Sequence, residues 1–141
     1  MRKPIYLLLE KKINKTETIK RVENLLDRYW LIKIRLEEDY PNITSILSPI
    51  GGGEFIPGKS KVENYVFRKE DAIRYLETIE HAVEQLPELE RRIIKEKYLS
   101  KEYISDIELY KKLMLSERSY YRYRNSALIN LGILLNVAVY E

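Results

Sequence analysis

Residues 86–135 read LPELERRIIKEKYLSKEYISDIELYKKLMLSERSYYRYRNSALINLGILL, and this stretch decides the fold. Its apolar residues recur every three or four positions, which is the spacing of amphipathic helices. Pro87 stands where a helix can begin, and the acidic residues after it suit a helix N-terminus. Ser105 and Ser116 can each cap a further helix. We therefore expect three helices, over residues 87–99, 105–114 and 116–135.

The last of these helices has two different faces. The inward face is expected to carry Tyr120, Tyr123, Ala127 and Leu131. The opposite face carries Arg118, Ser119, Tyr121, Arg122 and Asn125. Arginine pairs with guanine and asparagine with adenine in the major groove, whereas hydroxyl groups hold phosphates. A polar face alone is typical of any solvated helix, but the capped helix and turn before it favour a helix-turn-helix unit that binds double-stranded DNA.

The side chains of this unit have expected roles in DNA binding. Arg118 and Arg122 are the expected base readers. The other polar-face residues and the cap residue Ser116 are expected to add contacts. The cations expected to hold phosphates are Lys101, Lys111, Lys112 and Arg124. Most tyrosines are expected in the core, Tyr98 and Tyr110 among them, whereas Tyr121 is expected to point outward.

Two longer helices are expected before this unit. The first spans Thr16 to Tyr40, ends before Pro41 and carries Tyr29 and Trp30 on or near its apolar stripe. A loop rich in glycine and proline follows over residues 42–58. The second helix spans residues 62–86, with an apolar stripe of Val66, Ile73, Leu76, Ile79, Val83 and Leu86.

No stretch alternates as a strand, so the predicted fold class is all-α. The expected sequence of parts is an N-terminal helix, a Gly/Pro loop, a long central helix and the C-terminal helix-turn-helix. The expected division is residues 1–59, a helix and loop for oligomerisation or a partner, and residues 60–141, the helical domain. The N-terminal helix either forms such an interface or folds back on the central helix, and the sequence leaves both open.

One motif points to a different function. Residues 53–60, GEFIPGKS, fit the phosphate-binding pattern GxxxxGK[ST]. Such a loop joins a buried strand to a helix, and a second strand brings a magnesium-binding aspartate. The residues upstream are broken by Pro49, and those downstream have a helical pattern. An ordinary loop is therefore favoured, and an ATP-binding protein that depends on Lys59 is an alternative.

Composition limits the function classes. The net charge is only +3, so binding to nucleic acid depends on where the cations lie. The single histidine, His81, lies among glutamates, a setting more typical of a helix surface than of a metal site. We expect no catalytic residue, metal or cofactor. The absence of cysteine fits a cytoplasmic protein, and no segment approaches the roughly 20 apolar residues that span a bilayer.

Three segments carry a resemblance to a known family. They are LLEKKINKTETIKRVENLLDRYW (8–30), KSKVENYVFRKEDAI (59–73) and SERSYYRYRNSAL (116–128). They resemble the ArpU family of phage transcriptional regulators, which is related to the RinA activators, and residues 86–131 are similar to the region-4 helix-turn-helix of sigma factors. The resemblance implies a regulator of phage late genes or host cell-wall-associated genes, acting at promoters.

The sequence departs from this pattern at the turn. Met114 stands where helix-turn-helix units usually have glycine, and Tyr110 stands where a small residue is usual, so a looser turn is expected. A single recognition helix gives limited affinity, so a homodimer or host RNA polymerase is an expected partner. A sigma-like adaptor that binds polymerase and hardly contacts DNA is the other alternative.

Overall fold

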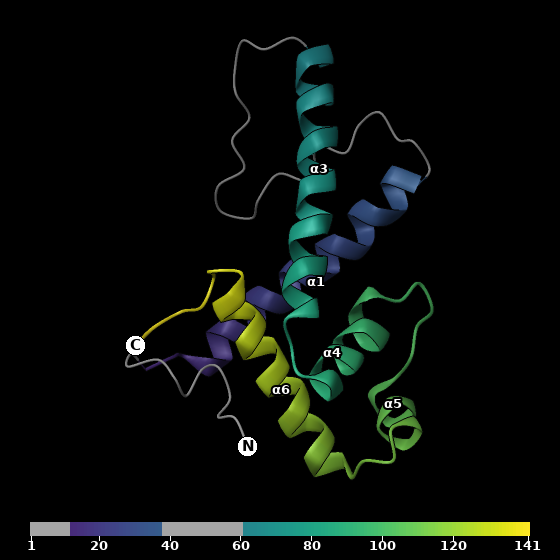
Figure 1. The fold of residues 1–141 in the computed structure, drawn as a ribbon, viewed down its shortest axis with the longest axis vertical. Helices are drawn as coiled ribbons and strands as arrows, with labels where there is room; N and C mark the ends of the chain where they lie inside the picture. The colour runs from purple at the N-terminus through teal and green to yellow at the C-terminus, as the bar shows by residue number, and fades with distance from the viewer. Residues whose placement is uncertain (1–11, 38–60) are drawn as a thin grey trace.

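The computed structural model describes residues 12–37 and 61–141, with side chains from residue 69 onward in the second range. The helices in these ranges are α1 (Lys15–Glu37), α3 (Lys61–Glu84), α4 (Glu88–Ile94), η2 (Lys95–Leu99), α5 (Asp106–Lys112) and α6 (Glu117–Leu134) (Figure 1). The all-α prediction is confirmed. Within the described ranges the β contact is an isolated antiparallel bridge between Ile13 and Tyr140.

The C-terminal helices occur close to their predicted bounds because their caps are local. Ser105 Oγ accepts a hydrogen bond from the Glu108 amide at 3.2 Å, and Ser116 Oγ accepts one from the Ser119 amide at 3.1 Å. These bonds satisfy amides that the first turn of a helix leaves free. The helix predicted over residues 87–99 is present as α4 and η2, and its last turn is wound as a π-helix.

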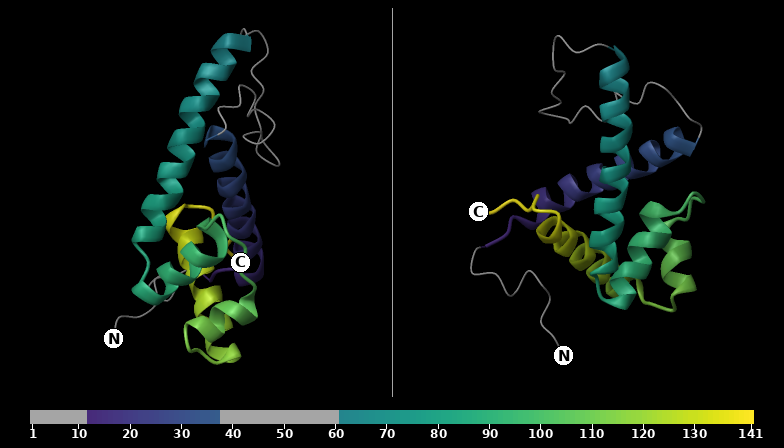
Figure 2. Two further views of the ribbon diagram at one scale, coloured as in Figure 1. Left: turned by 90° about the vertical axis from the view of Figure 1, so that its right-hand side faces the viewer. Right: turned by 45° about the horizontal axis from the view of Figure 1, so that its top comes forward.

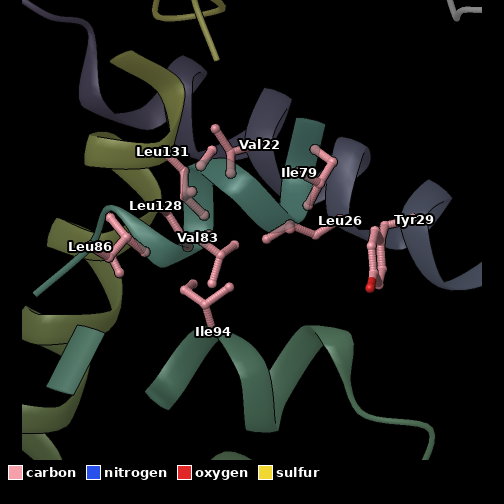
Figure 3. Close-up of a cluster of buried hydrophobic side chains, with 11 residues drawn as sticks. Val22, Leu26, Tyr29, Ile79, Val83, Leu86, Ile94, Leu128 and Leu131 are labelled. Carbon is pink, nitrogen blue, oxygen red and sulfur yellow. The ribbon is translucent and has the colours of Figure 1, made fainter. Parts of the chain in front are cut away.

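The main core lies where α1, α3, α4 and α6 meet (Figure 3). Its completely buried side chains come from all four helices and include Val22, Leu26, Val83, Ile94, Leu128 and Leu131. The sequence left open whether the N-terminal helix forms an interface or folds back on the central helix. The structure shows that α1 packs against the central helix α3. α1 therefore shares a core with the C-terminal helices.

α6 crosses α1 closely near its carboxyl-terminal end. A Cβ atom on Gly132 would lie 2.5 Å from Thr18 Cγ2 and 3.4 Å from Val22 Cγ2, so a larger residue fits only if the helices shift. Thr18 is completely buried, and its hydroxyl accepts a hydrogen bond from the Val139 amide at 3.0 Å. The carboxyl-terminal half of α6 is thus fixed in the core, while its amino-terminal half leads away from α1 (Figure 2).

The apolar stripe of α3 differs from the prediction at one position. Ile73, expected in the core, is 43% exposed, and its neighbour Ala72 is completely buried instead. Ala72 packs in a small cluster with Ile32 of α1. The correction follows from the helix crossing, since α1 lies against the alanine side of α3, where a small residue lets the helices approach.

Several predictions fall outside the described residues. They are the end of the first helix at Pro41, the Gly/Pro loop over residues 42–58, the side chain of Val66 and the GEFIPGKS motif of residues 53–60. Of the helices that the structure describes, none is long and apolar enough to cross a membrane.

Candidate nucleic-acid interface

The turn between α5 and α6 is tightly hydrogen-bonded. The Leu115 amide donates to the Tyr110 carbonyl at 2.9 Å, and the Met114 amide donates to the Lys111 carbonyl at 3.1 Å. This pair of bonds is a Schellman motif, which satisfies the last carbonyls of α5. Met114 has a φ of 58°, the left-handed conformation that glycine adopts most easily. The expected looser turn is therefore wrong, because methionine here takes the glycine conformation with its side chain 92% exposed.

A second, smaller core lies beside this turn. Ile93 of α4, Leu109 of α5 and Tyr120 of α6 are completely buried in it. The Tyr120 hydroxyl donates to Asp106 Oδ1 at 2.5 Å, and Lys97 Nζ lies 3.6 Å from the same oxygen. Burial, and then the neighbouring Asp106 carboxylate, raise the pKa of Tyr120. The protonated hydroxyl therefore ties α6 to the first turn of α5.

Tyr110 belongs to this smaller core rather than disrupting it. Its ring packs beside that of Tyr120, with ring centroids 5.7 Å apart and planes inclined by 53°. Tilted aromatic pairs of this kind are favourable. A large residue at this position is thus accommodated by contact between two tyrosines.

Three polar residues share an exposed face on the amino-terminal half of α6. Arg118, Arg122 and Asn125 are spaced by four and three residues, so they lie on one side of the helix, and all three are exposed. Among the described residues, no carboxylate forms an ion pair with either arginine. Arg122 packs on Tyr123, with its guanidinium carbon 5.3 Å from the ring centroid. Both cations are therefore available to an anionic ligand.

Two residues predicted on this face lie partly inside the protein. Ser119 and Tyr121 are partly buried. The Tyr121 ring meets the Tyr120 ring edge-on, with centroids 5.2 Å apart, and packs against the smaller core. Tyr121 is therefore partly buried, since one side of its ring covers apolar surface.

Arg124, predicted to hold phosphate, is an internal anchor. Its Nε donates to the Tyr98 hydroxyl and its terminal NH2 group donates to Glu23 Oε2, both at 3.0 Å. The Tyr98 hydroxyl also donates to Glu23 Oε2 at 3.1 Å. The Arg124 side chain is only 18% exposed. The structure thus corrects the phosphate assignment, since this guanidinium joins α6 to η2 and α1.

The lysines that were predicted to hold phosphates lie in two separate places. Lys111 and Lys112 are exposed at the end of α5, beside the turn that leads to the cap residue Ser116. Lys112 Nζ lies 2.5 Å from Glu96 Oε1, whereas Lys111 forms no ion pair with any described residue. Lys101 lies apart from them, with Nζ 2.6 Å from Glu37 Oε2 at the end of α1. The end of α5 and the start of α6 therefore supply the cations near the exposed face.

The chain is 30% identical over 135 residues to a protein of Listeria innocua serovar 6a named "Uncharacterized phage-related protein Lin1259/Lin1739". The alignment covers 90% of this chain and 92% of the relative. The chain belongs to this phage-related family. Comparisons with models of protein families and with solved structures gave no match.

The helical unit of this chain also contains a buried polar pair that the sequence did not indicate. Glu90, in the first turn of α4, is 8% exposed, and its Oε1 accepts a hydrogen bond from Asn130 Nδ2 at 2.8 Å. Asn130 is completely buried, and its Oδ1 has no partner among the described residues. Burial raises the pKa of Glu90, while hydrogen bonds from Asn130 and Ser126 oppose the rise. The pair joins α4 to α6 within the helical unit.

His81 is exposed on α3. In the part of the chain that the structure describes, no three histidine, cysteine, aspartate or glutamate side chains are grouped as metal ligands would be. The candidate site is therefore the exposed face of α6 with the lysines beside it.

Proposed function

We propose that this protein is a non-catalytic regulator of transcription, similar to the ArpU family, that binds double-stranded DNA in a sequence-specific manner. The observation that carries the proposal is the exposed face formed by Arg118, Arg122 and Asn125. These side chains project from a helix whose other half is fixed in the main core. A rigid helix with free donors on one side suits insertion into a major groove.

The predicted contacts follow from the positions of the side chains. Arg118 and Arg122 read base edges, preferring guanine, and Asn125 is placed to read adenine. Lys111 contacts phosphate beside the groove, and the exposed Lys112 does so by exchanging its Glu96 partner for a phosphate. The Ser116 hydroxyl can still donate to a phosphate while it caps α6. Arg124 contributes little because it is an internal anchor, and Lys101 contributes little because it pairs with Glu37 of α1, away from the α5–α6 turn.

The sites of action proposed are promoters of phage or prophage late genes in the cytoplasm of a bacterial host. The family relationship to a phage-related protein and the resemblance of residues 116–128 to ArpU regulators support this context. One recognition helix supplies limited affinity, so host RNA polymerase or a second copy of the chain is the proposed partner on DNA.

A gel-shift titration tests the DNA-binding proposal. The probe is duplex DNA from the region that flanks the protein's own gene, with shuffled duplex as competitor. Arg118→Ala and Arg122→Ala are each expected to reduce the preference for the specific duplex by about 1–3 kcal/mol, which is roughly 5- to 150-fold. Arg74→Ala is a matched control, since Arg74 is an exposed cation on α3, and binding should be unchanged.

The salt dependence of binding separates the alternatives. Loss of Lys111 is expected to weaken binding to all sequences and to lower the slope of log affinity against log salt by about one. If Arg118→Ala and Arg122→Ala both leave the sequence-specific gel shift intact, the assignment of this face of α6 as the DNA-binding surface is wrong. No shift at any salt concentration would favour a polymerase-binding adaptor instead.

A further inference from the structure

An open groove of about 390 Å³ lies between α1 and the end of η2 together with the residues that follow it. Its walls include Trp30 and Leu31 of α1 on one side, and Tyr98 and Tyr103 on the other. Leu31 is 45% exposed and Tyr103 is 86% exposed. Single exposed apolar residues are ordinary, but these side chains line one groove together. The groove therefore offers apolar and aromatic surface for a binding partner.

The lysines at this groove are already neutralised within the protein. Lys97 Nζ donates to the Ile104 carbonyl at 3.0 Å and lies 3.6 Å from the Asp106 carboxylate. Lys101 Nζ lies 2.6 Å from Glu37 Oε2. These two cations therefore have little charge left to offer an anionic ligand.

The uncompensated charges at the groove are acidic. Asp27 and Glu102 both line it, and neither forms an ion pair with any described residue. Burial, and then the neighbouring Glu23, raise the pKa of Asp27, which is the direction expected for a carboxylate without a compensating cation. A positively charged occupant gains energy here, whereas a phosphate group would be repelled.

We propose that this groove docks a segment of a partner protein that presents apolar side chains flanked by lysine or arginine. The apolar walls bury the aliphatic side chains, and Asp27 and Glu102 pair with the cations. The site is separate from the proposed DNA interface. Its lining comes from residues 27–31 of α1 and from residues 97–103, and neither Arg118 nor Arg122 of α6 lines it.

Trp30 gives a direct measurement, because it is the only tryptophan of the chain and it lines the groove. The probe is a short helical peptide with two leucines one turn apart, flanked by lysines and otherwise composed of alanine. The matched control peptide has glutamate in place of each lysine. Saturable change of Trp30 emission is expected with the lysine peptide, and at least about tenfold weaker binding with the glutamate peptide.

Substitutions in the groove provide the remaining tests. The double variant Asp27→Asn, Glu102→Gln should bring the two peptides to similar affinity, and Leu31→Ser should weaken the lysine peptide. All three positions are exposed, so circular dichroism should show that both variants are folded. Duplex DNA should not compete with the peptide.

Several outcomes would overturn the proposal. Equal binding of the two peptides to the natural chain would show that charge does not select the partner. If neither peptide binds, the groove is not a docking site for such a segment. Competition by duplex DNA would place nucleic acid in the groove. Trp30 emission that changes with protein concentration alone would show that a second copy of the chain occupies it.

Discussion

Arg124 and Arg122 lie two residues apart on α6, yet the structure predicts opposite consequences for their loss. Arg124→Met keeps the length of the side chain but removes the bonds to Tyr98 and Glu23. Arg122→Met makes the same chemical change at an exposed position. The comparison therefore isolates the internal role of Arg124 from the general effect of losing a cation.

The magnitude follows from the contacts of Arg124. A hydrogen bond to a charged group contributes about 1.5–3 kcal/mol, and Arg124 makes one to the Glu23 carboxylate and one to the Tyr98 hydroxyl. Glu23 is 35% exposed, so water partly compensates the carboxylate after the cation is removed. We expect Arg124→Met to lower the free energy of unfolding by about 2–3 kcal/mol, or roughly 7–10 °C in Tm. Arg122→Met should leave stability nearly unchanged.

Denaturant unfolding followed by circular dichroism and by Trp30 fluorescence measures both variants. Glu23→Gln serves as a second probe, and the double variant with Arg124→Met should lose less than the sum of the single losses, because the residues share one network. At a temperature where all variants are folded, DNA binding should fall further in Arg122→Met than in Arg124→Met. Equal stability of the two arginine variants would refute the internal role of Arg124.

Three further substitutions test other parts of the fold. Met114→Gly should raise the free energy of unfolding by about 0.5–1 kcal/mol, because glycine adopts the left-handed φ without strain; a lower value by denaturant titration would contradict this account of the turn. Gly132→Ala should lower it by about 1–3 kcal/mol through the clash with Thr18 Cγ2, and adding Thr18→Ser, which removes that atom, should restore part of the loss. If Gly132→Ala lowers the free energy of unfolding equally with threonine and with serine at position 18, the contact with Thr18 Cγ2 is not the cause. Because burial raises the pKa of Glu90, its contribution to stability is fully present below the unfolded pKa and is lost as pH rises through the folded pKa. The stability of Glu90→Gln relative to the natural chain should therefore increase as the pH rises above the ordinary pKa of glutamate, about 4.3, and a difference independent of pH would exclude this titration.

Features encoded within a few residues were predictable from the sequence. Ser105 and Ser116 mark the starts of α5 and α6 because a cap acts on amides in the next turn. The exposed positions of Arg118, Arg122 and Asn125 follow from helical periodicity once the start of α6 is known.

Features that depend on distant contacts were not predictable in this way. Glu23 and Arg124 are 101 residues apart, so neither position indicates the other as a partner. Arg124 looked like a solvated cation because periodicity describes a helix surface without showing what covers it. The burial of Ala72 in place of Ile73 also depends on a distant contact. The position of α1 decides which side of α3 is buried, and periodicity within α3 does not reveal it.

The division of α6 into a half fixed in the core and an exposed half has a consequence for diversification. Positions 118, 122 and 125 have no described duty in folding, whereas positions 127–132 are all buried. Under the proposed function, exchanging residues at the first three positions alters the preferred operator at little cost to the fold. Regulators of related prophages in one host could then share this fold and still bind different operators, because only a few side chains would differ.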